Sequence, residues 1–313
     1  MIMEKQDQPD RLDEFKDNID ELQFWVKEYI NSKKFKEIIE FIGKFRYLAP
    51  YNAMLVNIQK PGATFVFKGD KWLKYHRQIK LNAQPLLTLI PFGPVQAMFD
   101  YSDTEPIPGY EDVAELQKIK EWEDALMQAE GYIETEALSN LIGNLPLYGI
   151  YLDDNFSASN SFCGYIKNDT RHIIDIHISA FKSISYHSVF SISLNKNYSD
   201  TVKFHTLCHE LGHLFCCHLQ YGNGTCRNLS NIESEFEAET VAWLVCKRHG
   251  IDNPSEEYLA NYAEGDKIPV CSFDHVLKAV TEIEKMMKSI LSITDSKWYK
   301  KDKDFKKAIQ DVM

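Results

Sequence analysis

Residues 203–219, KFHTLCHELGHLFCCHL, constrain the fold of this chain more strongly than any other segment. Within them, His209, Glu210 and His213 form the pattern H-E-x-x-H. Side chains four residues apart project from the same face of a helix, one turn apart, so both imidazoles can reach one tetrahedral metal ion. Glu210 lies one position further round the helix and can hold a water molecule without itself becoming a ligand. The segment therefore predicts a helix that carries part of a zinc site, with Zn²⁺ as the cofactor.

A third ligand has to come from another element, and the acidic segment ESEFEAETVAW is the best source. Glu235 follows His213 by 22 residues, which is enough for a loop and one turn of a second helix. Glu239 shares the helical face of Glu235 and can orient a ligand histidine through its second ring nitrogen. Glu237 would point about 160° away, and Glu233 lies at the helix start, where it can serve the cap or the dipole. We therefore favour Glu235 as the ligand and Glu239 as its supporting carboxylate.

A simpler interpretation makes the second segment a solvated acidic helix and the two histidines core residues. It would have to explain the histidine pair, the adjacent glutamate, the cap at Ser199 or Asp200 and the placement of the acidic helix together. Gly212, inside the motif, permits close approach of another backbone or of a substrate. The combination favours the metal site.

The length and composition of the chain limit the class of protein to which it can belong. A chain of 313 residues is long enough for two domains. No window approaches the roughly 18 apolar residues of a membrane span, and the start, MIMEKQDQPDRLDEF, lacks the apolar core of a secretory signal. Seven cysteines without a C-x-x-C pair indicate reduced thiols in a cytoplasmic protein, with Cys216 and Cys217 as structural residues rather than ligands.

The charge is unevenly distributed. The net charge of −11 argues against wholesale nucleic-acid binding, but residues 41–83 hold eight basic residues against one acidic residue, a local charge of +7. Aromatic residues alternate with these cations, as in proteins that stack single-stranded DNA bases. The alternative places the aromatics in the core of a small α+β domain with a solvated lysine face. The nucleic-acid candidates are Lys44, Arg46, Lys68, Lys71, Trp72, Lys74 and Arg77.

Apolar periodicity and turn signals predict an α+β chain. We expect a flexible tail at 1–20, a small α+β domain at 21–105, a linking helix at 106–130, and a second domain at 131–313. Strands are expected at about 63–104 and 148–195. Helices are expected in the regions 22–42, 52–59, 199–219 and 231–249, and an amphipathic helix is expected from 272 onward.

Two family resemblances add to this interpretation. ISLNKNYSDTVKFHTLCHELGHLF followed by EFEAETVAWLV resembles the ImmA/IrrE metallopeptidases, in which an H-E-L-G-H helix precedes E-x-E-A-x-x-x-A. FRYLAPYNAMLVNIQKPGATFVFKGDKWLKYHRQIK followed by VQAMFDYSDT is similar to the N-terminal domain of ArdC-type antirestriction proteins. Those proteins place E-x-x-A-E after their motif, which corresponds to Glu235, Ala238 and Glu239 here. Both resemblances therefore imply Glu235 as the third ligand.

The resemblance implies a gluzincin-like zinc endopeptidase: a zincin-like domain with C-terminal helices, joined to an ArdC-like domain. Glu210 would activate water for attack on a peptide bond. The strand SVFSISLN, residues 188–195, could pair with an extended substrate. The candidates for stabilising the oxyanion are Tyr198, His218 and Tyr221.

Three functional hypotheses follow. The first is an endopeptidase that cleaves a protein partner, such as a repressor or a restriction component, in mobile-element, antirestriction or stress regulation, with the N-terminal domain bringing it to DNA. The second is an antirestriction protein that acts mainly by binding single-stranded DNA, with a structural or secondary metal site. The third is a zinc-dependent hydrolase of another substrate. An intact Glu210 favours the first, since a structural metal site needs no general base.

Overall fold

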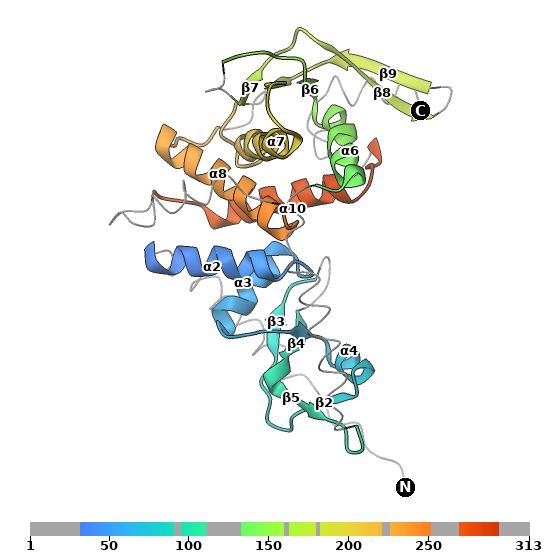
Figure 1. Cartoon of the computed structure of the whole chain (residues 1–313), viewed down its shortest axis with the longest axis vertical. Coiled ribbons are helices and arrows are strands. Elements are labelled where there is room, and N and C mark those ends of the chain that lie inside the picture. Colours follow the sequence, from blue (N-terminus) through green and yellow to red (C-terminus); the bar gives the residue numbers. More distant parts are fainter. Residues whose placement is uncertain are drawn as a thin grey trace. The chain divides into compact units, whose positions relative to one another are not determined.

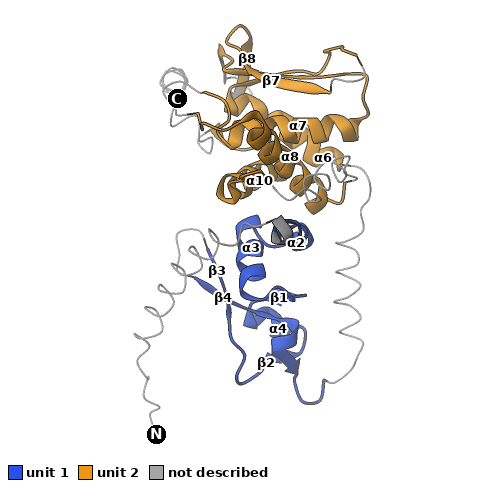
Figure 2. Cartoon of the chain, turned by 90° about the vertical axis from the view of Figure 1, so that its left-hand side faces the viewer, with its two compact units in different colours: residues 1–127 blue, residues 128–313 orange. Residues whose placement is uncertain are grey.

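The computed structural model describes residues 32–90, 95–110, 133–159, 163–179, 182–220, 226–251 and 269–293. Helices and strands are both present, so the chain is of the mixed α+β class that the sequence predicts. It divides into two compact units, Met1–Met127 and Gln128–Met313 (Figure 2). The tail predicted at 1–20 and most of the linking helix predicted at 106–130 lie outside the described residues.

Among its described residues, unit 1 contains three helices and a small antiparallel sheet whose strand order is β1-β4-β3. A second pair, β2 with β5, lies beside the short helix α4. The elements are α2 (Ser32–Lys44), α3 (Pro50–Gln59), β1 (Val66–Phe67), α4 (Gly69–Lys74), β2 (Arg77–Ile79), β3 (Leu86–Thr88), β4 (Gln96–Asp100), the 3-10 turn η1 (Tyr101–Asp103) and β5 (Thr104–Pro106).

Helix α3 covers the outer edge of strand β3. Asn52 and Gln59 lie two turns apart on one helical face. The side-chain amide of Asn52 donates to the carbonyl of Leu89 and accepts from its N–H, both at 2.9 Å. Gln59 makes the same pair of bonds to Leu87, at 2.9 and 2.8 Å. The two side chains thus occupy backbone groups that an edge strand would otherwise present for pairing with another chain.

The aromatic residues of unit 1 form its core. Phe65, Phe67 and Trp72 are buried together, and the indole nitrogen of Trp72 donates to the carbonyl of Phe99 at 2.9 Å. Buried Asp100 accepts from the N–H groups of Thr64 and Phe65, at 2.7 and 3.1 Å. The packing agrees with the second interpretation of residues 41–83, in which the aromatics are core residues.

Unit 2 is built on a three-stranded sheet, a separate hairpin and four helices among the described residues. Helix α7 packs against strands β7 and β10 of the sheet and against helices α8 and α10; Figure 1 shows it between β7 and α8. The elements are α6 (Thr135–Asn144), the 3-10 turn η2 (Leu145–Tyr148), β6 (Ile150–Asp153), β7 (Gly164–Asn168), β8 (Ile173–Ser179), β9 (Lys182–His187), β10 (Phe190–Leu194), α7 (Asp200–Phe215), α8 (Asn231–Arg248) and α10 (Phe273–Lys288).

Strand β10 is the centre of the sheet, which has the order β6-β10-β7. It runs parallel to β6 and antiparallel to β7, and all five of its residues are buried. The prediction that residues 188–195 pair with a substrate is therefore wrong, because both edges of β10 are already paired. Among the described strands of this sheet, β7 is the edge strand that packs against α7.

Candidate metal centre

Capping residues begin both helices of the site, and the cap of α7 is one of the two predicted residues. Ser199 caps α7, its hydroxyl accepting from the N–H of Val202. A capping box starts α8, in which Ser230 and Glu233 bond each other's backbone N–H groups, at 3.3 and 2.8 Å. Glu233 thus serves the cap, one of the two roles the sequence allowed it.

Gly212 brings α7 and α8 into close contact. A Cβ added to Gly212 would lie 3.0 Å from the Cα and 3.1 Å from the carbonyl oxygen of Ala238. Any larger residue would therefore push α8 away. Glu235 lies about one turn before Ala238, and Glu239 directly follows it. The contact at Ala238 therefore sets the distance of both glutamates from the histidines of α7.

The three predicted ligands converge. His209 Nε2 lies 3.1 Å from His213 Nε2. One carboxylate oxygen of Glu235 lies 3.3 Å from His209 Nε2, and the other lies 3.5 Å from His213 Nε2. Ligand atoms about 2.0–2.1 Å from a tetrahedral zinc ion are about 3.3 Å apart. The spacing and the two-nitrogen, one-carboxylate donor set both fit such an ion, which identifies these residues as a group that could hold a metal.

Glu239 supports the first histidine from behind. Its Oε2 lies 2.7 Å from His209 Nδ1, the ring nitrogen that faces away from Glu235. Its other oxygen lies 3.6 Å from Nε2 of buried His205. Sequence reasoning missed His205, although His205, His209 and His213 recur every four residues, a spacing that would have placed it on the same face.

The charges of the site stabilise one another. Burial disfavours the charged form of His209, but the bonds to Glu235 and Glu239 outweigh burial and raise the pKa of His209 to about 10. The bonds to His209 and His213 hold the pKa of Glu235 well below its usual range. A proton and a metal ion would compete for the same imidazole nitrogen.

Glu210 lies between the ligands and the sheet. Its side chain is buried, and its Oε2 accepts a 2.9 Å hydrogen bond from the N–H of Ile166 on β7. Burial raises the pKa of Glu210, against the opposing influence of His209 and His213. The carboxylate is therefore next to the ligand set and under the edge of β7.

The second histidine contacts His218 rather than a carboxylate. His213 Nδ1 lies 3.0 Å from His218 Nδ1, and His218 Nε2 lies 2.9 Å from Glu237. As predicted, Glu237 lies on a different face of α8 from Glu235. Its side chain is fully buried, on the far side of His213. His218 sits behind the Nδ1 side of that ring, so it cannot serve the predicted oxyanion role on the Nε2 side.

Of the other two oxyanion candidates, Tyr198 lies in the described part of the chain. Tyr198 precedes α7, and the helix runs for about 14 Å between its first residue, Asp200, and His209. Tyr221 lies outside the described residues.

The fold buries some of the residues predicted to contact nucleic acid and exposes others. Trp72 is fully buried. Arg77 is buried too and donates to the hydroxyl and carbonyl of Thr104, at 2.7 and 2.9 Å. Neither residue can contact a nucleic acid in this structure. Lys71 is partly buried, with its amine 3.8 Å from the centre of the Phe67 ring. The candidates that remain are half-buried Arg46 and the exposed Lys44, Lys68 and Lys74.

Comparison with protein-family models, with curated proteins and with solved structures found no match to the chain. The described helices include none with the length and apolar character needed to cross a membrane. The seven cysteines are all free thiols.

Proposed function

We propose that this chain is a zinc-dependent endopeptidase whose site is His209, His213, Glu235 and Glu210. The observation that carries the proposal is the triangle of donor atoms, 3.1, 3.3 and 3.5 Å on its sides. The carboxylate of Glu210 lies beside this triangle and is not one of its three donors. A structural zinc site is normally closed by four protein ligands, whereas a catalytic site keeps one position open. Three converging donors with an adjacent glutamate fit the catalytic kind.

A zinc ion in such a site polarises a carbonyl group and lowers the pKa of a water molecule. The residues of the chain supply the remaining chemistry. Glu210 accepts the proton of the attacking water on a carboxylate oxygen and passes it to the nitrogen of the leaving amine. Glu239 keeps the proton of His209 on Nδ1, which leaves Nε2 free to bind the metal.

The edge of β7 supports a peptide as the substrate. The N–H of Ile166 points away from β10 and towards Glu210. Backbone groups alternate along a strand, so Gly164 and Asn168 direct theirs to the same edge. An extended peptide that pairs along this edge would bring its backbone past Glu210 and the ligands. The pairing would replace the Glu210–Ile166 bond and release the carboxylate for its catalytic role.

The proposal extends the resemblance to ImmA/IrrE peptidases. Unit 2 would be a zincin-like domain with C-terminal helices, and unit 1 an ArdC-like domain; the substrate would be a protein partner such as a repressor or restriction component. The hypothesis that single-stranded DNA binding is the main activity loses support, because its stacking residue Trp72 is buried. The third hypothesis, hydrolysis of a non-peptide substrate, has less support, because the edge of β7 suits pairing with a peptide backbone.

The test is cleavage of a mixed decapeptide library by zinc-loaded protein, read by mass spectrometry. We expect the unaltered chain to cleave and Glu210→Gln to lose at least about 100-fold in rate while binding zinc normally. Glu40→Gln, the same change at an exposed position on α2, is the matched control and should cleave normally. Cleavage by Glu210→Gln at the unaltered rate, or no cleavage by the unaltered chain, would overturn the proposal.

A further inference from the structure

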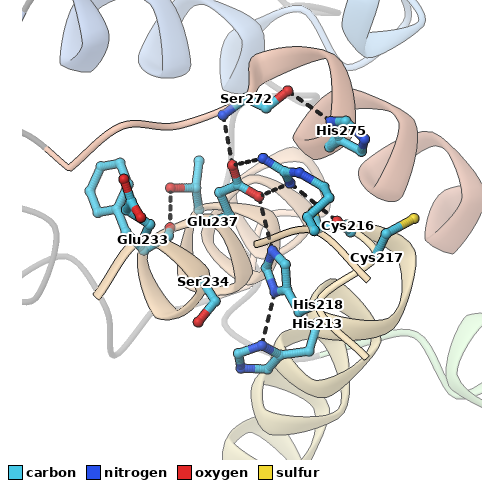
Figure 3. Close-up of polar contacts among 12 residues, drawn as sticks. His213, Cys216, Cys217, His218, Glu233, Ser234, Glu237, Ser272 and His275 are labelled. Atoms are coloured by element: carbon cyan, nitrogen blue, oxygen red, sulfur yellow. Dashed lines mark hydrogen bonds and ion pairs between the residues drawn. The ribbon is translucent and has the colours of Figure 1, made fainter. Parts of the chain in front are cut away.

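A chain of hydrogen bonds leads from His213, the second histidine of the proposed zinc site, into the protein interior. His213 Nδ1 lies 3.0 Å from His218 Nδ1, and His218 Nε2 lies 2.9 Å from an oxygen of Glu237 (Figure 3). The side chain of His218 is 4% exposed and that of Glu237 is fully buried. Such a chain has a defined direction, because its last member can only accept hydrogen bonds.

The proton positions follow from Glu237. An ionised carboxylate donates nothing, so His218 must carry its proton on Nε2. The Nδ1 atom of neutral His218 then has a lone pair and accepts, so the proton of the next bond belongs to His213 Nδ1. This leaves the lone pair of His213 on Nε2, the nitrogen that faces His209 and Glu235. The network thus selects the tautomer that can bind a metal ion.

Glu237 is itself held in place by several donors. Arg227 donates to both of its oxygens, at 2.5 and 2.9 Å, and the N–H of Ser272 donates at 2.7 Å. With His218 these donors occupy both carboxylate oxygens of Glu237, and the guanidinium of Arg227 balances its negative charge. The negative end of the chain is therefore fixed in position and in charge.

We propose that His218 and Glu237 are positioning residues for His213, acting as a longer counterpart of the Glu239–His209 contact. This inference rests on the proposed zinc site. Each ligand histidine would then have its Nδ1 proton held by a carboxylate, directly for His209 and through one imidazole for His213. Partners of this kind raise the basicity of a ligand and fix its ring, and their loss costs roughly 10–100-fold in metal affinity.

A different role for the same residues is a second metal site, because Cys216, His218 and Glu237 lie close enough to share an ion. The hydrogen bonds argue against it. Both oxygens of Glu237 and both nitrogens of His218 are already engaged. The guanidinium of Arg227 lies in contact with the carboxylate and would repel a second cation. We therefore assign the group to positioning.

The test combines zinc affinity with imidazole nitrogen NMR on the full-length chain. Titration against a competing chelator should give one zinc per unaltered chain and a 10–100-fold weaker affinity for His218→Phe. His218→Asn keeps an acceptor near the Nδ1 position and should recover part of the loss. His187→Phe, the same change at an exposed residue of β9, is the control and should bind normally. In metal-free unaltered protein, the nitrogen shifts should place the proton of His213 on Nδ1.

The outcomes separate the two proposals. Unchanged zinc affinity in His218→Phe, a His213 proton on Nε2 in the unaltered protein, or two zinc ions per chain would overturn the positioning role and leave the peptidase proposal standing. If the unaltered chain binds no zinc, the proposed function is overturned and the positioning role with it. The NMR result on the unaltered protein decides the case even if His218→Phe fails to fold.

Discussion

Gly212 and Ala238 meet with almost no space between their helices, since a methyl group on Gly212 would lie 3.0 Å from the Cα of Ala238. Gly212→Ala should therefore force α7 and α8 apart and weaken zinc binding by at least about 10-fold. Overpacking costs about 1–3 kcal/mol, which exceeds the gain of up to about 1 kcal/mol from replacing a helical glycine. Zinc titration and chemical denaturation would measure the two effects. Gly62→Ala is the control, since a Cβ there meets nothing within 4 Å; normal zinc binding by Gly212→Ala would contradict the packing argument.

Glu239 should matter for metal affinity although it is not a ligand. In Glu239→Gln the carboxylate beside His209 Nδ1 is replaced by a neutral amide, and we expect zinc affinity to fall by about 10–100-fold. Chelator competition would measure the loss. Glu233→Gln is the matched control on the same helix, because glutamine also completes a capping box. Equal affinities for the two variants would argue against the orienting role of Glu239.

Zinc should stabilise the chain against unfolding. At a free zinc concentration of 1,000 times Kd, binding to the folded state alone adds about 4 kcal/mol. In a unit of this size that corresponds to a rise in Tm of about 8–16 °C. Calorimetry with and without a chelator would measure it. Glu235→Ala removes one of the three donors, and most of the zinc-dependent shift should disappear in that variant. An identical shift in both proteins would show that the ion binds elsewhere.

Asp100 should give unit 1 a dependence on pH. Burial opposes its ionisation, but the bonds from Ser102 and Thr64 prevail and lower its pKa. Because the pKa of Asp100 is lower in the folded state, its contribution to the free energy of unfolding is complete above the unfolded pKa of about 3.9. That contribution disappears as the pH falls through the folded pKa. Hydrogen exchange of the N–H groups of Thr64 and Phe65 would report it. We expect Asp100→Asn to lower their protection at pH 7 and the difference to shrink below about pH 4. Equal protection at pH 7 would contradict the prediction.

The site could be predicted where helical spacing alone determines it. His209, His213, Glu235 and Glu239 lie on two helices, and spacings of four residues assign them to common faces before any tertiary contact is known. The same reasoning placed Glu237 on another face, but it did not reveal the contact with His218. That contact depends on the loop after α7 and on Arg227, whose position no local pattern determines.

The sheet was harder to predict. The alternating pattern in residues 188–195 correctly indicated a strand, but whether a strand lies at an edge depends on its pairing with segments far along the chain. Here β6 and β7 occupy both sides of β10. Trp72 presents the same difficulty, because aromatic residues among lysines suit both a core and a stacking face. Burial decides between these two interpretations, and it is a property of the tertiary structure.

X-ray absorption at the zinc edge of the loaded protein tests the central claim most directly. Coordination by His209, His213 and Glu235 predicts only nitrogen and oxygen neighbours at about 2.0–2.2 Å, with the outer-shell scattering of two imidazole rings. The signal should weaken or change in Glu235→Ala. A neighbour at about 2.3 Å would be a sulfur atom; it would place the ion at Cys216 and contradict the claim.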